Sequence, residues 1–159
     1  MAIEHPDQCA VLRTLNTLGD MWTLGILRCV FYGQRRYTEI QRELGIATNV
    51  LADRLDALVA HGILEKVPYQ DRPVRHEYVL TPKGADFAPA IVALREWGRL
   101  HLDWDEALPP LRHAGCGGVI EAATVCRDCG AHVDPDQFTM PAQVVPAPGT
   151  ELPRPGTGS

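Results

Sequence analysis

Apolar residues recur at steps of three and four between Gln8 and about Arg28. This spacing follows the turn of an α-helix and places the apolar side chains on one face. The positions are Val11, Leu12, Leu15, Leu18, Trp22, Ile26 and Leu27. Gly19 and Asp20 interrupt the pattern, because both residue types favour turns and helix ends. We therefore expect two consecutive helices in this part of the chain.

Two further helical patterns follow, separated by a glycine. The first runs from Thr38, which can cap its start, to Leu44, and Gly45 ends it. The second runs from about Ala47 to Ala60, where leucines recur at the helical period and a His-Gly pair marks the stop. These leucines are Leu51, Leu55 and Leu58. Two helices joined by a tight glycine turn predict a helix-turn-helix.

Two alternating segments after this pair predict a β-hairpin. Residues 63–69 and 74–80 read as strands, and Gln70 to Pro73 join them as a turn. Apolar and charged residues alternate along the second segment, which places them on opposite faces. A hairpin in this position is the wing of a winged helix-turn-helix. We therefore expect a mainly α fold with one small β-hairpin.

Thr81 and Pro82 predict the start of a long helix that runs to about Trp104. Thr81 supplies an N-cap, and proline is tolerated at the first helical position because that N–H lacks a partner anyway. The apolar side of the helix holds Phe87, Ile91, Leu94, Trp97 and His101. So small a domain cannot cover this stripe completely, which predicts packing against a second copy and a homodimer built from N- and C-terminal helices. The alternative is that the first two helices cover it within one chain.

The second helix of the predicted pair carries residue types that can read base edges. If its leucines point into the core, the outer face holds Asn49, Ala52, Asp53 and Asp56, with Thr48 and Arg54 at its edges. Asn can pair bidentately with adenine, Thr can contact a thymine methyl, and Asp can accept from cytosine. The alternative is a helix face that is merely solvated.

Arginines flank this helix in the sequence. Arg35 and Arg36 lie just before the first helix of the pair, and Arg72 and Arg75 lie at the hairpin tip. Such positions suit phosphate contacts and a minor-groove probe. With Thr38, they complete the predicted contacts to double-stranded DNA.

Charge is distributed unevenly along the 159 residues, whose net charge is −5. Residues 28–83 hold nine Lys or Arg against seven acids, whereas residues 105–159 hold three against seven. The middle of the chain is therefore the better candidate for DNA binding. No run of about 18 apolar residues occurs, and MAIEHPDQ is unlike a signal peptide, so we expect a cytoplasmic protein without a membrane partner.

Motifs spread over about residues 9–104 together resemble the HxlR-type regulators. They are Cys9, LGDMWTL (18–24), Ile26-Leu27, Gly33, Arg36-Tyr37, 46–51, Arg54-Leu55, 62–64, 67–69, Pro73, Glu77-Tyr78, Leu80-Thr81, Gly84 and Trp97-Gly98. The resemblance implies a winged-helix fold related to MarR proteins, a dimer built from terminal helices, and transcription regulation by repression or activation. Ala47 stands where the family often has the serine that opens the recognition helix, so Thr48 is expected to cap it instead.

The resemblance also implies a role for Cys9, because several HxlR-type regulators sense electrophiles or oxidants through a cysteine at this position. The alternative is an inert, half-buried thiol, since reactivity requires a stabilised thiolate and access. Cys29 lies among apolar residues and is expected in the core.

Four residues near the C-terminal end have the spacing of zinc ligands. His113, Cys116, Cys126 and Cys129 form H-x2-C-x9-C-x2-C, in which each pair lets one turn direct two side chains at a tetrahedral ion. A zinc-ribbon-like extension with a structural Zn²⁺ is therefore expected. Unliganded or redox-active thiols and a disulfide are the alternatives, and His132 could replace His113.

The expected organisation is an N-terminal arm (1–8), a winged helix-turn-helix domain (9–106), a Cys/His extension (107–140) and a disordered Pro/Gly-rich tail (141–159). An enzyme is not expected, because no nucleophile elbow, phosphate-binding glycine loop, HExxH or dinucleotide fingerprint occurs. The alternative function is a winged-helix protein-interaction module that does not bind DNA.

Overall fold

The computed structural model describes residues 9–138. The chain divides into two compact units, Met1–Ala122 and Ala123–Ser159. This boundary falls inside the segment 107–140 that we expected to be one extension. The expected arm at 1–8 and tail at 141–159 lie outside the described residues.

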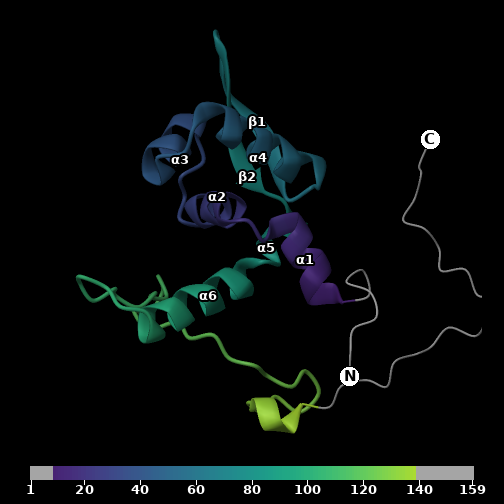
Figure 1. Cartoon of the computed structure of the whole chain (residues 1–159), viewed down its shortest axis with the longest axis vertical. Coiled ribbons are helices and arrows are strands. Elements are labelled where there is room, and N and C mark those ends of the chain that lie inside the picture. Colours follow the sequence, from purple (N-terminus) through teal and green to yellow (C-terminus); the bar gives the residue numbers. More distant parts are fainter. Residues whose placement is uncertain (1–8, 139–159) are drawn as a thin grey trace, which may run out of the picture. The chain divides into compact units, whose positions relative to one another are not determined.

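Four helices open the first unit where the apolar period predicts them (Figure 1). They are α1 (Ala10–Leu18), α2 (Met21–Phe31), α3 (Tyr37–Leu44) and α4 (Thr48–Ala60). Asp20 separates α1 from α2 as an N-cap, since its carboxylate accepts hydrogen bonds from the backbone N–H groups of Trp22 and Thr23, both at 3.1 Å. The predicted break at Gly19-Asp20 is therefore confirmed.

Gly45 shapes the turn between α3 and α4. Its φ of 60° lies in the left-handed region, which glycine adopts without the steric cost that a Cβ brings. Its N–H donates to the carbonyl of Gln41 at 2.9 Å and closes α3. Ile46, only 3% exposed, then anchors the turn in the core. Together they direct α4 away from α3 and form the helix-turn-helix.

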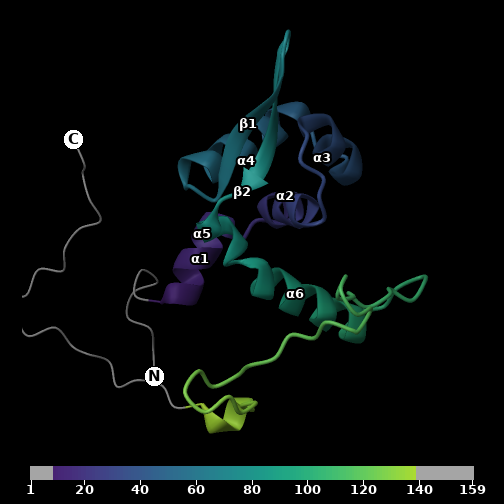
Figure 2. The ribbon, with the colours of Figure 1, turned by 180° about the vertical axis from the view of Figure 1, so that it is seen from behind.

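A two-stranded antiparallel hairpin follows α4. It consists of β1 (Leu64–Asp71) and β2 (Val74–Leu80), paired from Leu64 and Leu80 at its base, with one irregularity after Pro68. In Figures 1 and 2 its far end extends beyond the helices. The mainly α winged helix-turn-helix expected from the sequence is confirmed.

The single long helix expected from Thr81 to about Trp104 is wrong, because the structure has two helices there. α5 spans Pro82–Ala85 and α6 spans Ala88–His101. Thr81 does cap α5 as predicted, accepting from the N–H of Gly84 at 3.1 Å. Pro89 explains the break: within one continuous helix it could not donate to the carbonyl of Ala85, whereas in the first turn of a new helix its missing N–H needs no partner.

The hydrophobic core lies among α2, α3, α4 and the base of the hairpin. Its largest fully buried side chains are Ile26, Leu27, Cys29, Ile40, Leu51, Leu55, Leu58 and Leu64. Cys29 is thus a core residue, as expected, and Trp22 packs half-buried against the cluster. Within residues 9–138, no helix has the length and apolar character to cross a membrane.

Candidate nucleic-acid interface

α4 leaves one of its faces uncovered by the core. Leu51 and Leu55 are completely buried, whereas Thr48, Asn49, Ala52 and Asp53 are exposed. The predicted division of this helix into a buried and an exposed face is therefore confirmed. Whether the exposed residues contact DNA is not tested by this geometry and stays a prediction.

The start of α4 is fixed differently from the expectation. Ala47 is the N-cap and supplies no side-chain hydrogen bond, and Thr48 is already the first helical residue, so the prediction that Thr48 caps this helix is wrong. Instead the hydroxyl of Tyr37, from α3, donates to the carbonyl of Thr48 at 2.8 Å. A side chain from the neighbouring helix thus holds the end of α4 nearest to Asn49.

The first helix of the pair also begins without the predicted threonine cap. Arg36 is the N-cap residue of α3, two residues earlier than expected, and Thr38 is an exposed residue inside the helix. Glu39 reaches back to accept hydrogen bonds from the backbone N–H groups of Arg35 and Arg36, at 3.2 and 3.1 Å. Glu39 therefore fixes the backbone from which the two arginines project.

Arg54 points from α4 toward α2. Its Nε lies 3.3 Å from the Oδ1 of Asp20, the residue that caps α2. Arg54 was predicted at the edge of the DNA-facing surface, but this ion pair makes it a link between α4 and α2. Both side chains remain about two-fifths exposed, so water screens the pair and its own contribution to stability is small.

Hydrogen bonds hold the pKa of Asp20 below its usual value. Partial burial opposes this and would raise the pKa, but hydrogen bonds from the hydroxyl and N–H of Thr23, the charge of Arg54 and the N–H of Trp22 outweigh it. The carboxylate therefore stays charged at the point where α1, α2 and α4 are joined.

Replacing Asp20 with alanine is expected to lower the free energy of unfolding by about 0.5–2 kcal/mol, because α2 loses its cap. Since the pKa is lowered by folding, this stabilisation is complete above the pKa of the unfolded carboxyl and disappears as the pH falls through the folded value. Urea unfolding should therefore show the difference between wild type and variant shrinking in acid. Asp20→Asn is the control, since it keeps a capping oxygen but cannot titrate; a constant difference at all pH values would contradict the assignment.

The segment before α3 joins the arginines to the wing. The N–H of Tyr78, in β2, donates to the carbonyl of Arg35 at 2.8 Å. The backbones of Arg36 and Glu77 also form an isolated antiparallel β-bridge. The guanidinium of Arg36 lies over the ring of Tyr69, with 4.5 Å from Cζ to the ring centroid. Arg36 is thus positioned by the wing although it precedes α3 in the sequence.

A hollow of about 360 Å³ lies between the start of α3 and the wing. It is lined by Arg36, Tyr37, Thr38, Tyr69, Arg75, His76 and Tyr78. Two of the arginines predicted to bind phosphates therefore face one cavity, together with polar groups that can donate hydrogen bonds. Arg72 is exposed in the turn at the end of the hairpin.

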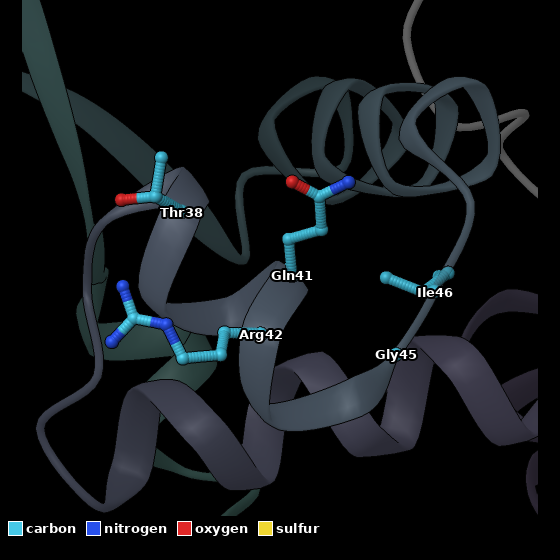
Figure 3. A pocket seen from close by; sticks show the side chains of 5 residues that line it. All are labelled: Thr38, Gln41, Arg42, Gly45 and Ile46. Carbon is cyan, nitrogen blue, oxygen red and sulfur yellow. The ribbon is translucent and has the colours of Figure 1, made fainter.

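A second hollow, of about 510 Å³, lies along α3 and the turn that follows it (Figure 3). Thr38, Gln41 and Arg42 project from the helix, and Gly45 and Ile46 form the turn beside them. Both hollows share Thr38, so polar groups continue from the wing along α3 toward the turn. An arrangement of this kind can grip a phosphate backbone while an adjacent helix meets base edges.

Residues 17–106 match the HxlR-like helix-turn-helix family. The chain belongs to this family. A helix-turn-helix-type transcriptional regulator of Mycobacterium tuberculosis strain H37Rv is 40% identical over 141 residues, which cover 88% of this chain and 85% of the relative. One from Synechocystis is 34% identical over 99 residues, covering 62% of this chain and 71% of that protein. Relatives of this HxlR-like chain are thus described as transcriptional regulators.

Solved structures agree with this placement. The crystal structure of PA1607, a proposed transcription factor, is 34% identical, with a TM-score of 0.74 over 84% of this chain and 94% of its own. The redox regulator HypR in its oxidised form is 30% identical, with a TM-score of 0.57 over 60% of this chain and the whole of HypR. The HxlR-like chain therefore shares the fold of proteins described as regulators.

Several side chains of the HxlR-like surface were missed by the sequence analysis. Gln41 and Arg42 follow Thr38 by three and four positions, a spacing that places them on one side of a helix and could have identified them. Tyr69 and His76 lie on the two strands of the wing, and only the register of the hairpin brings them to Arg36.

The cysteines of this HxlR-like chain, all within the described residues, are free thiols. Cys9 is half-buried and immediately precedes α1. Of the predicted metal ligands, His113 and Cys116 are neighbours, with His113 Nδ1 lying 3.2 Å from Cys116 Sγ. Backbone N–H groups of Cys129 and Asp128 lower the pKa of Cys126. No group of three or more His, Cys, Asp or Glu residues within 9–138 is placed to hold a metal ion.

Proposed function

We propose that the chain is a sequence-specific regulator of transcription that binds double-stranded DNA. The observation that carries the proposal is the exposed face of α4 beside arginines contributed by α3 and the wing. Asn49 and Thr48 supply groups for base edges, and Arg36, Arg72 and Arg75 supply charges for phosphates. Selectivity for sequence would therefore come from α4, and affinity for the phosphate backbone from the arginines beside it.

The distribution of charge supports selective rather than indiscriminate binding. The exposed Asp53 on α4 repels phosphates, and Asp56 pairs with Lys66 of the wing at 2.8 Å instead of standing free. Affinity must therefore come from the flanking arginines, whose phosphate contacts do not depend on the base sequence. Selectivity would come from α4, which gains base contacts only on a duplex with suitable base edges.

Selection of bound duplexes from a pool of random sequences tests this function. The expected result is enrichment of one sequence motif, which the purified chain then binds at least about a thousandfold more tightly than unrelated DNA. A pool that stays random would overturn sequence-specific regulation. Absence of any duplex binding would favour the alternative, a winged-helix module that contacts only proteins.

We also propose that the regulator is a homodimer that pairs through α6 and α1. Leu94, Trp97 and Leu100 of α6 are 56, 59 and 62% exposed, and Val11 and Leu15 of α1 are 65 and 52% exposed. The chain's own first two helices therefore leave the apolar side of α6 largely open. Large apolar side chains gathered on a surface favour burial against another molecule, and a second copy fits a regulator that reads two half-sites.

Replacing Trp97 with glutamate is expected to weaken the dimer by at least about 30-fold, because the charge would be desolvated at the centre of the contact. Light scattering after size-exclusion chromatography should show the mass shift from dimer to monomer at micromolar concentration. Val74→Glu, at a wing residue that is 63% exposed, is the matched control and should leave the mass unchanged. A Trp97→Glu variant that keeps the dimer mass would contradict pairing through α6.

Regulation through Cys9 is a narrower proposal. Its support is the half-buried position of Cys9 at the start of α1, a helix of the proposed dimer contact, and the similarity to the redox regulator HypR. Oxidation of this thiol would alter the contact and hence the spacing of the two reading helices. Diamide treatment should change operator affinity in the wild type but not in Cys9→Ser; equal affinity with and without diamide would refute it.

A further inference from the structure

The first turn of α4 begins without a cap of its own. Ala47, the N-cap residue, supplies no side-chain hydrogen bond. Alanine in this position leaves the first N–H groups of a helix without the oxygen that serine, threonine or asparagine would offer, and such an end frays easily. Thr48 and Asn49, the residues proposed to meet base edges, lie in this turn. The part of α4 that needs the most accurate placement therefore has the weakest support from its own sequence.

The opposite end of α4 is held by several contacts. The hydroxyl of Thr81 donates to the carbonyl of Gly62 at 2.6 Å, and Lys83 Nζ donates to the carbonyl of His61 at 2.8 Å. Leu58, in the last turn of the helix, is buried in the core. That end of α4 is therefore fixed by the start of α5 and by the core, whereas the first turn depends on what α3 provides.

Tyr37 supplies the missing support from α3. Its hydroxyl donates to the carbonyl of Thr48 at 2.8 Å, and within residues 9–138 no other side chain forms a hydrogen bond with the backbone of residues 47–50. Val50 and Leu51 pack the inner side of the turn against the core. Apolar packing has no preferred direction, whereas a hydrogen bond does, so the Tyr37 hydroxyl restricts how the turn can rotate on the core.

The hydroxyl of Tyr37 is itself held in a fixed position. Its ring is half-buried and packs against the core. The backbone before it is held by Glu39, which accepts from the N–H of Arg36 at 3.1 Å, and by Tyr78, whose N–H donates to the carbonyl of Arg35 at 2.8 Å. A group can position another only if its own surroundings restrain it, and Tyr37 meets this condition.

We propose that Tyr37 is a positioning residue for base reading, which ties the first turn of α4 to the segment that carries the phosphate-binding Arg36. The inference rests on the proposed function, since it needs Asn49 at a base edge. An amide forms both of its hydrogen bonds to one adenine only if it is held within about 0.5 Å of the correct place. Loss of the Tyr37 hydroxyl frees the turn to move, and the correct base is then distinguished less well from the others.

Tyr37→Phe tests the proposal because it removes the hydroxyl and keeps the ring. The quantity measured is the preference for the selected operator over the duplex changed at the base pair where Asn49→Ala loses discrimination. This preference is expected to fall by about 3- to 10-fold, the worth of one hydrogen bond. The slope of log affinity against log salt should keep the wild-type value, because no phosphate contact is lost. Tyr32→Phe, at an exposed tyrosine that ends α2, is the matched control and should keep the preference.

A double variant, Tyr37→Phe with Asn49→Ala, separates positioning from a base contact made by Tyr37 itself. Because Tyr37 acts through Asn49, the double variant should show the same preference as Asn49→Ala alone, and losses that multiply would overturn the proposal. An unchanged preference in Tyr37→Phe, with only a lower free energy of unfolding in urea, would overturn it as well, and so would an equal loss of affinity for every sequence. In these cases the wild type still selects a motif and the proposed function stands, whereas a pool that stays random would refute both.

Discussion

Replacing Arg36 and Arg75 together with alanine is expected to weaken binding to every duplex, whatever its sequence. The two side chains line one hollow between α3 and the wing, where they can each neutralise a phosphate. Loss of two phosphate contacts should lower the slope of log affinity against log salt by about 1.8, and the affinity by roughly 60-fold at about 0.1 M salt. Fluorescence anisotropy of labelled duplexes over a range of salt concentrations measures both quantities.

Arg13→Ala combined with Arg127→Ala is the matched control for this loss of charge. Both arginines are exposed and lie outside α3, α4 and the wing, and the change in net charge is the same. The control should keep nearly the wild-type salt slope. If it weakens binding as much as the Arg36 and Arg75 variant, then affinity depends on overall charge and the wing hollow has no special role.

Replacing Asn49 with alanine is expected to remove discrimination at one base pair of each half-site while leaving nonspecific affinity unchanged. Asn49 is exposed in the first turn of α4, and its amide can donate to and accept from one adenine at once. Such a contact is worth about 1–3 kcal/mol, which corresponds to roughly 5- to 150-fold in preference for the correct base. Competition between the selected operator and its single-base variants measures this preference.

Asn16→Ala is the matched control, since Asn16 is also an exposed asparagine on a helix, but on α1. It should leave base preference unchanged. A uniform loss of affinity for all sequences in Asn49→Ala would assign Asn49 to the phosphate backbone, and an unchanged preference would remove it from the DNA-facing surface.

Local patterns in the sequence predict the fold well because they reflect forces that act within one element. The leucines of α4 recur at the helical period because one face of that helix is buried. Glycine occurs at position 45 because the turn there requires a left-handed backbone conformation. Pro89 carried the signal for the break between α5 and α6, because a proline there cannot continue a helix begun at Pro82. The apolar period nevertheless continues across Pro89, and for this reason the sequence pattern predicts one helix where the structure has two.

Side-chain positions that depend on distant parts of the chain are not available from such patterns. Arg54 was expected at the DNA-facing edge of α4, yet Asp20 attracts it because α2 happens to pack there. Arg36 meets Tyr69 only because the backbone of Arg35 pairs with Tyr78. Each of these contacts joins residues more than 30 positions apart, so no periodicity or local propensity encodes it.

Equilibrium binding of the wild-type chain to a labelled duplex between about 50 and 200 mM salt tests the central claim, that α4 and the arginines beside it form a DNA-binding surface. We predict binding at the lower salt concentration that weakens steeply and log-linearly as salt rises, with Arg36 and Arg75 accounting for about two units of the slope. Failure to bind any duplex at the lower concentration, or an affinity indifferent to salt, would contradict the account.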